Sequence, residues 1–483
     1  MITPAKVLGF IIASYLSILT LSVALDYTIK GNSTIKYFTI SHIIGFEKFK
    51  SERLESLDKQ KLASEKEEYE HELLASMKTL ADSVNVAQKI ADLDSTRFWL
   101  PNNNRAFWDE LFAQWEYLRT SKTLFRILHY GDSQIEMDRI TAYIREKLQH
   151  QFGGGGPGLL PALQLVPSYT IQQSSSDNWK RRVSFGIEDD RASHGHYGVA
   201  GTLCNFDSAF ATVSIRPRNR KVFYNLQKFE TAKILVGRLS TPLNVSISYP
   251  RGTNTQTVHP KNTEQMIRWN FDTAQAYFNF SFRGDTTADI LGIAIDPKWG
   301  IVLDNIPWRG SSGLTFTSIS KSSLKKTYQF LNVKMVIMQF GGNSVPYLKN
   351  ATMIENFVQR FGRQIEHIKA IDPSIRILII GPSDMSVNEN GQMVTYPLLE
   401  TLITRMREVS NEKGAAYWSL YHAMGGKNSM PKWVKAQPPL GAPDYIHFSQ
   451  QGANEIAVLL KNAIWREYDI YQKKKRLETN PSE

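Results

Sequence analysis

A serine, a histidine and an aspartate in this sequence have neighbours that suit acyl-transfer chemistry. Ser133 follows Gly131 and Asp132 directly after an apolar, aromatic run, and far downstream Asp444 stands three residues before His447. A serine hydroxyl attacks an ester carbonyl only when a base takes its proton. A carboxylate on the other ring nitrogen keeps that base in the correct tautomer. We therefore predict Ser133 as the nucleophile, His447 as the general base and Asp444 as the group that orients it.

The same reaction needs hydrogen-bond donors for the negative oxygen of the tetrahedral intermediate. Asn343 ends the run Gly341-Gly342-Asn343 after another apolar segment, and its side-chain amide can donate. The backbone N–H of Ser133 is a second candidate, because Ser133 is predicted to stand where a strand turns into a helix. We interpret Asp132 as a carboxylate that stabilises this turn and not as a proton carrier.

The elements that must position these residues alternate between strands and helices. Apolar runs predict strands at 125–130, 333–340, 375–380 and 415–420. Apolar residues at helical spacing predict helices over 140–152, 354–368, 399–409 and 456–464. Such alternation predicts a doubly wound α/β domain, in which a parallel sheet has helices on both faces. Ligands of such a sheet bind at the carboxyl ends of its strands, where Ser133 and Asn343 fall.

These three motifs together resemble the SGNH (GDSL-type) hydrolase family, since they occur in the family's order and each lies beside a predicted strand. The resemblance covers about residues 107–465 and implies a flavodoxin-like fold with an acyl-enzyme formed on Ser133. It also implies an oxyanion hole made by the backbone N–H groups of Ser133 and Gly310 and by the Asn343 amide, with Gly313 as the alternative glycine. We expect no cofactor.

Between the two predicted parts of this domain, 101–204 and 301–470, the periodicity changes. Apolar residues alternate with polar ones over 211–215, 243–249 and 278–282, which predicts half-buried antiparallel strands. We therefore predict an inserted all-β sandwich over 205–300, preceded by a loop-rich segment over 174–201. The insert resembles carbohydrate-binding modules, and a purely structural lid is the alternative. His194-Gly195-His196 has a spacing that suits a metal, but without an evident third ligand we expect no metal site.

The first hundred residues have a different character. The 19 residues from Val7 to Leu25 are almost all apolar, which predicts a transmembrane signal anchor within 1–30. Cleavage after Ser22-Val23-Ala24 is the alternative. Residues 31–100 are predicted to form a helical stalk, and 471–483 a polar tail. We expect a single-pass protein of the cell inner membrane with its catalytic domain in the periplasm.

The net charge of +11 and the pI near 9.3 favour anionic partners such as phospholipid headgroups or acidic wall polymers. The sequence shows no fingerprint of nucleic-acid binding. Its one cysteine, Cys204, excludes an internal disulfide.

Three functions remain open on the sequence. The first is an esterase that acts on O-acylated envelope glycan, similar to bacterial peptidoglycan O-acetylesterases. The second is a membrane-anchored polysaccharide O-acetyltransferase that uses the same triad and receives acetyl groups from a membrane acyltransferase partner. The third is a glycan-binding module without catalysis. The inserted β module favours an esterase and the membrane anchor favours a transferase. We favour the esterase, because the inserted module is the less common of these two features.

Overall fold

The computed structural model describes residues 97–479, with gaps at 187, 208, 219–222, 224 and 286. The predicted signal anchor and nearly all of the predicted stalk lie outside this range. Within it, none of the helices combines the length and the apolarity that a membrane span needs. The predicted polar tail begins inside a helix, because α11 (Gln450–Thr479) continues nine residues past position 470.

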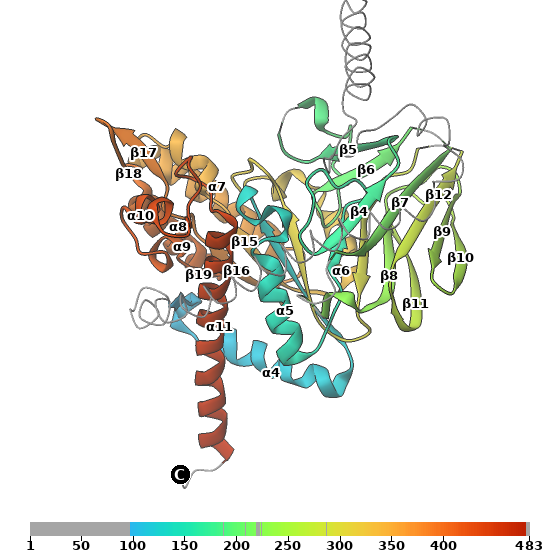
Figure 1. Cartoon of the computed structure of the whole chain (residues 1–483), viewed down its shortest axis with the longest axis horizontal. Coiled ribbons are helices and arrows are strands. Elements are labelled where there is room, and N and C mark those ends of the chain that lie inside the picture. The colour runs from blue at the N-terminus through green and yellow to red at the C-terminus, as the bar shows by residue number, and fades with distance from the viewer. Residues whose placement is uncertain are drawn as a thin grey trace, which may run out of the picture. The chain divides into compact units, whose positions relative to one another are not determined.

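A mostly parallel six-stranded sheet forms the centre of the predicted α/β domain (Figure 1). Its strand order is β1-β19-β16-β15-β2-β14, and only β1 runs antiparallel to its neighbour. The strands are β1 (Phe98–Trp99), β2 (Leu124–Gly131), β14 (Gly300–Pro307), β15 (Val333–Gln339), β16 (Arg376–Ile380) and β19 (Ala416–Trp418). The predicted strand at 415–420 is therefore real but only three residues long.

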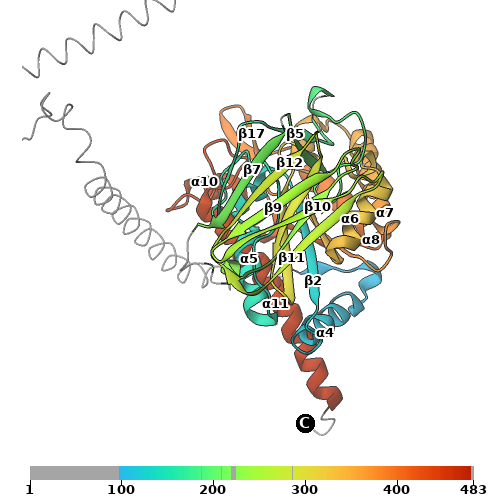
Figure 2. The ribbon, with the colours of Figure 1, turned by 90° about the vertical axis from the view of Figure 1, so that its right-hand side faces the viewer.

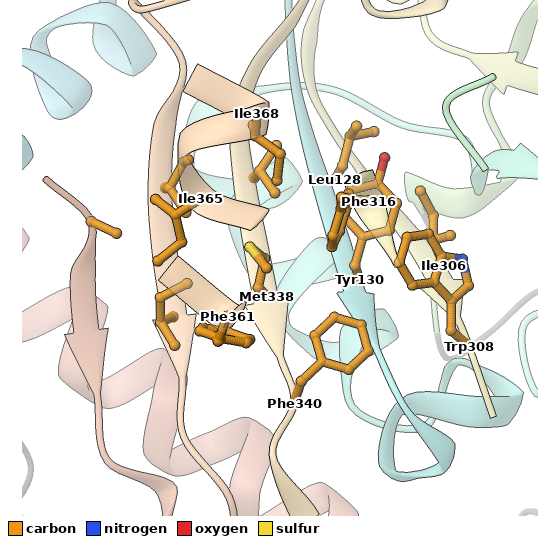
Figure 3. Packing of buried hydrophobic residues seen from close by; sticks show 14 of the residues in the cluster. Leu128, Tyr130, Ile306, Trp308, Phe316, Met338, Phe340, Phe361, Ile365 and Ile368 are labelled. Atoms are coloured by element: carbon orange, nitrogen blue, oxygen red, sulfur yellow. The ribbon is translucent and has the colours of Figure 1, made fainter. Parts of the chain in front are cut away.

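The parallel sheet has one hydrophobic core on each face. Successive side chains of a strand pack in different cores, because strand side chains alternate between the two faces of a sheet. Phe125 and Ile127 pack in one core, and Leu128 and Tyr130 pack in the other. The first core is closed by α4 (Ala106–Ser121), α5 (Thr141–Phe152) and α11. The second is closed by α6 (Lys321–Leu331), α7 (Ala351–Lys369) and α8 (Leu399–Glu412), and Figure 3 shows α7 contributing Phe361, Ile365 and Ile368. The doubly wound arrangement is thus confirmed.

Two antiparallel sheets form a sandwich beside this domain, and Figure 2 shows the strands of one of them in front. The five-stranded sheet has the order β10-β9-β12-β7-β4, and the six-stranded sheet has the order β11-β8-β13-β6-β5, with β3 also paired to β13. One core joins the sheets, in which Trp179 packs edge-on against Phe282. The strands are β3 (Gly158–Leu160), β4 (Ile171–Ser175), β5 (Trp179–Val183), β6 (Thr202–Phe206), β7 (Phe210–Pro217), β8 (Phe229–Val236), β9 (Leu243–Tyr249), β10 (Gly252–Val258), β11 (Gln265–Gln275), β12 (Phe278–Gly284) and β13 (Ile290–Asp296).

The sandwich begins well before residue 205, where the sequence placed its start. Strands β3, β4 and β5 come from residues that we assigned to the first catalytic part, and β5 lies in the segment predicted to be loop-rich. The physical reason is that β4 and β5 are edge strands, so few of their side chains are buried. Without regular apolar alternation they carried no strand signal.

A buried ion network joins the sandwich to the parallel sheet. Arg126 of β2 donates to Asp304 at 2.8 and 2.7 Å and to Asp296 of β13 at 2.5 Å, and Lys233 of β8 donates to Asp296 at 2.8 Å. All four side chains are almost fully buried. Two cations and two carboxylates balance each other, so their burial is tolerated only while the set is complete.

Candidate active site

Ser133 stands immediately beyond the carboxyl end of β2, at the start of a short 3-10 turn, η3 (Ser133–Asp138). The Asp132 carboxylate accepts the Gln134 backbone N–H at 2.9 Å and fixes the turn, as predicted for that residue. The α-helix begins only after this turn, at Thr141, close to the predicted start at residue 140. Glu136 is extended and Met137 has a positive φ of 62°, so the chain bends before α5 begins.

The histidine reaches the serine from the other end of the chain. The Ser133 Oγ and His447 Nε2 atoms are 2.9 Å apart, and His447 Nδ1 lies 2.7 Å from Asp444 Oδ2. This is the geometry in which an imidazole takes the hydroxyl proton through one nitrogen and donates to the carboxylate through the other. The three residues that the sequence singled out are therefore brought together.

Asp444 is held by its own turn. Its Oδ1 atom accepts the backbone N–H groups of Ile446 at 2.9 Å and His447 at 3.0 Å. Partial burial raises the pKa of Asp444, but hydrogen bonds from His447 and Ile446 outweigh this effect, so the pKa lies below its ordinary value. The carboxylate is thus charged at neutral pH, as the orienting partner of a histidine must be.

The Asn343 amide lies beside the serine turn, but its hydrogens are engaged. Asn343 Nδ2 donates to Asp132 Oδ2 at 3.1 Å and to the Ser311 carbonyl oxygen at 3.1 Å. An oxyanion would have to share or replace one of these acceptors. Burial raises the pKa of Asp132 to about 6, although its hydrogen bond from Gln134 and the charges of His447 and Arg139 oppose the shift.

The two glycines considered for the oxyanion hole differ in their surroundings. Both have positive φ, 75° at Gly310 and 79° at Gly313, which favours glycine at either place. A Cβ at Gly310 would meet no heavy atom within 4 Å, whereas a Cβ at Gly313 would lie 2.7 Å from the Phe340 ring. Phe340 belongs to the wall of the cleft that contains Ser133, and Gly310 does not. The oxyanion role of Gly310 stays a prediction.

Two further side chains tie the serine turn to the histidine segment. Gln134 Nε2 donates to the Ile446 carbonyl oxygen at 2.9 Å. Arg139 donates to the carbonyl oxygens of Ser133 at 2.8 Å, Gln134 at 2.8 Å and Phe448 at 3.3 Å. Sequence reasoning missed both, because their bonds to Ile446 and Phe448 join positions more than 300 residues apart.

The catalytic cleft above these residues has a volume of about 200 Å³. Beside Ser133 and His447 it is lined by Asn343, Tyr347 and Pro382. The Tyr347 side chain is 72% exposed, so an aromatic ring stands open to solvent at the mouth of the cleft.

His194 and His196 each face a carboxylate. His194 Nε2 lies 3.1 Å from an Asp289 carboxylate oxygen, and His196 Nδ1 lies 2.8 Å from one of Glu264. In the described part of the chain, no cluster of three or more metal-binding side chains occurs.

Comparison with solved structures identifies the fold. A peptidoglycan O-acetylesterase has a TM-score of 0.62 with this chain at 20% identity, covering 77% of this chain and 98% of that one. A family two carbohydrate esterase from Cellvibrio japonicus (8% identity, 62% and 99% covered) and a salicylyl-acyltransferase from a tetracycline biosynthetic pathway (9% identity, 62% and 95% covered) have TM-scores of 0.24 and 0.28, too low to bear on the fold. No family model and no curated sequence matches the chain.

The parallel sheet and this likeness define the α/β fold of the chain. The resemblance to SGNH hydrolases, predicted from three motifs, is confirmed at the level of the fold. More particularly, the fold is similar to that of a peptidoglycan O-acetylesterase. The match covers 98% of that esterase and 77% of this chain.

Proposed function

We propose that this protein is a serine esterase that removes O-acyl groups, in particular acetyl groups, from cell-envelope glycan. The observation that carries the proposal is the continuous hydrogen-bond chain from Ser133 Oγ through His447 to Asp444. Three groups from two segments about 311 positions apart meet at bonding distance in an open cleft at the carboxyl edge of the sheet. A structural role alone does not call for this arrangement.

The mechanism follows from these contacts. Ser133 Oγ bonds to the ester carbonyl carbon as His447 Nε2 takes the hydroxyl proton. The carbon–oxygen bond to the sugar then breaks, and His447 returns that proton to the departing sugar oxygen. A water molecule next gives a proton to His447 and bonds to the acyl carbon. The bond from that carbon to Ser133 Oγ then breaks, His447 returns the proton to Oγ, and the acid leaves. Asp444 stabilises the imidazolium that forms in both steps.

The negative oxygen in each tetrahedral intermediate needs donors, for which the Ser133 N–H, the Asn343 amide and the Gly310 N–H are proposed. Loss of one such donor typically costs about 3–4 kcal/mol of transition-state stabilisation. We therefore expect Asn343→Ala to lower kcat on a small acetyl ester by about 10²–10³-fold. Because the Asn343 amide also binds Asp132, unfolding measured on the same variant separates lost catalysis from lost structure.

Hydrolysis and acetyl transfer share the acyl-serine and differ only in the acceptor. Incubating the full-length protein with O-acetylated glycan, and separately with an acetyl donor and unmodified glycan oligomers, distinguishes them by mass spectrometry. The proposal expects free acetate and loss of 42 Da from acetylated glycan, about 42 Da being one acetyl group exchanged for a proton. Net acetylation of the oligomers with little free acetate would instead establish the transferase. Glycan binding without either product would establish a non-catalytic module.

A further inference from the structure

A second cavity, of about 500 Å³, lies where the sandwich meets the parallel sheet. Its wall includes Ile306 and Pro307 at the carboxyl end of β14, and Glu136 and Met137 of the turn that follows Ser133. β14 is the neighbour of β2 in the sheet. Adjacent strands lie about 4.8 Å apart, so the catalytic cleft and this cavity follow one edge of the sheet, separated by the turn 133–138. A polymer lying along that edge can occupy both.

Three arginines line the cavity, and only one of them lacks a carboxylate partner. Arg145 is held by both oxygens of Asp138, at 2.6 and 3.0 Å. Arg309 is held by Glu136, at 2.7 Å from its Nε atom. Arg181, on edge strand β5 of the sandwich, forms no ion pair with any described residue.

Arg181 is half-buried, and no carboxylate of the described residues pairs with its charge. Burial lowers the pKa of Arg181, while Cys204, Asp190 and Glu136 oppose this shift, and neither carboxylate is within ion-pairing distance. A guanidinium that has lost part of its water without gaining an acceptor raises the free energy of the protein. A carboxylate bound in the cavity would remove that cost through a charge-assisted hydrogen bond, to which guanidinium geometry is suited.

The remaining wall has a polar part, with Gln164, Ser168, Thr170 and Asn305, and an apolar part. Leu160, Leu163, Val166 and Phe185 line the cavity, and Leu165 beside them is 65% exposed. The apolar part of the wall suits methyl groups. We propose that this cavity binds a carboxylate-bearing, partly apolar substituent of the glycan, such as a lactyl or short peptide group, with Arg181 as its anion contact. This inference rests on the proposed function and gives the insert a direct part in recognising an acidic substrate.

The test compares Arg181→Met with Lys180→Met in the full-length protein. Both remove one positive charge from β5, but Lys180 is 57% exposed and pairs with Asp207 on the other face of the strand. The substrates are O-acetylated peptidoglycan fragments, which carry lactyl-peptide carboxylates, and neutral O-acetylated xylo-oligosaccharides. We expect Arg181→Met to lower the ratio of kcat/KM on the anionic fragments to that on the neutral ones by about tenfold or more, chiefly through KM. Lys180→Met should leave the ratio as in the wild type.

An unchanged ratio in Arg181→Met, or an equal change in Lys180→Met, would overturn the inference while leaving the esterase in place. If the wild type hydrolyses no acetyl ester, the proposed function fails, and calorimetry still tests the cavity. Deacetylated peptidoglycan fragments should then bind the Ser133→Ala protein, and binding should weaken tenfold or more when Arg181→Met is added. Equal binding by both proteins would refute the cavity's role.

Discussion

At the scale of single residues, solvent exposure decides how much Ser133, His447 and Asp444 each contribute to catalysis. The Asp444 side chain is 48% exposed and that of His447 39%, so water can partly take over the role of the carboxylate. Loss of a triad carboxylate can cost as much as about 10⁴-fold in kcat. We predict a smaller loss for Asp444→Asn, about 10²–10³-fold on a small acetyl ester, and a much larger one for His447→Ala. Equal losses in the two variants would contradict this reasoning.

The burial of the Asp132 carboxyl predicts how the stability of the protein depends on pH. Its pKa is about 6 in the folded protein and near the ordinary 3.8 in the unfolded chain. Between these pH values the folded protein keeps a proton that the unfolded chain has lost, so wild-type stability falls as the pH rises and levels off above about 6. Asp132→Asn has no such titration. Urea unfolding should show the wild type losing about 2–3 kcal/mol relative to Asp132→Asn between pH 4 and 7. A constant difference would show that burial does not shift this pKa.

The sequence could predict Ser133, Asp444 and His447 because each belongs to a short motif whose spacing carries its chemistry. It could not predict Gln134 and Arg139 as positioning residues, since their hydrogen bonds reach Ile446 and Phe448 and depend on the folded arrangement alone. Nor could it show that the amide of Asn343 already donates to Asp132 and Ser311.

At the scale of elements, the burial of each strand explains which strands the sequence could predict. Strands such as β2 and β15 are buried on both faces and gave continuous apolar runs, and β9 and β12 gave clear alternation. The edge strands β4 and β5 gave neither, so the start of the sandwich was placed too late. A buried apolar pattern thus reveals a strand, while backbone pairing at a polar edge leaves no trace in the sequence.

The buried ion network predicts how strongly the sandwich and the parallel sheet are held together. It consists of Arg126, Asp296, Asp304 and Lys233. Lys233→Met leaves the Asp296 carboxylate buried with one cation instead of two. Breaking a buried ion pair on one side typically costs about 3–5 kcal/mol, so we expect the free energy of unfolding to fall by about that amount. Lys180→Met is the matched control, because its pair with Asp207 is exposed and worth no more than about 1 kcal/mol. Equal effects in urea unfolding would contradict a structural role for the network.

At the scale of the whole molecule, the predicted anchor leads to a prediction about where the protein is located. We propose that the apolar run from Val7 to Leu25 holds the chain in the inner membrane, since 19 helical residues span about 28 Å, close to the hydrocarbon thickness. The full-length protein should then stay in the membrane fraction after alkaline carbonate extraction, and external protease should digest it in spheroplasts. Release by carbonate, or a mature chain beginning near Leu25, would contradict the anchor.

The central claim is that Ser133 carries the acyl group, and trapping that intermediate tests it most directly. The full-length protein is mixed with a fluorophosphonate probe, and separately quenched in acid during turnover of an acetyl ester, and its peptides are then analysed by mass spectrometry. The account predicts the label, and a 42 Da acetyl adduct, about the mass of an acetyl group less one proton, on Ser133. Ser133→Ala should carry neither and should not release acetate. Labelling or turnover that survives Ser133→Ala would contradict the account.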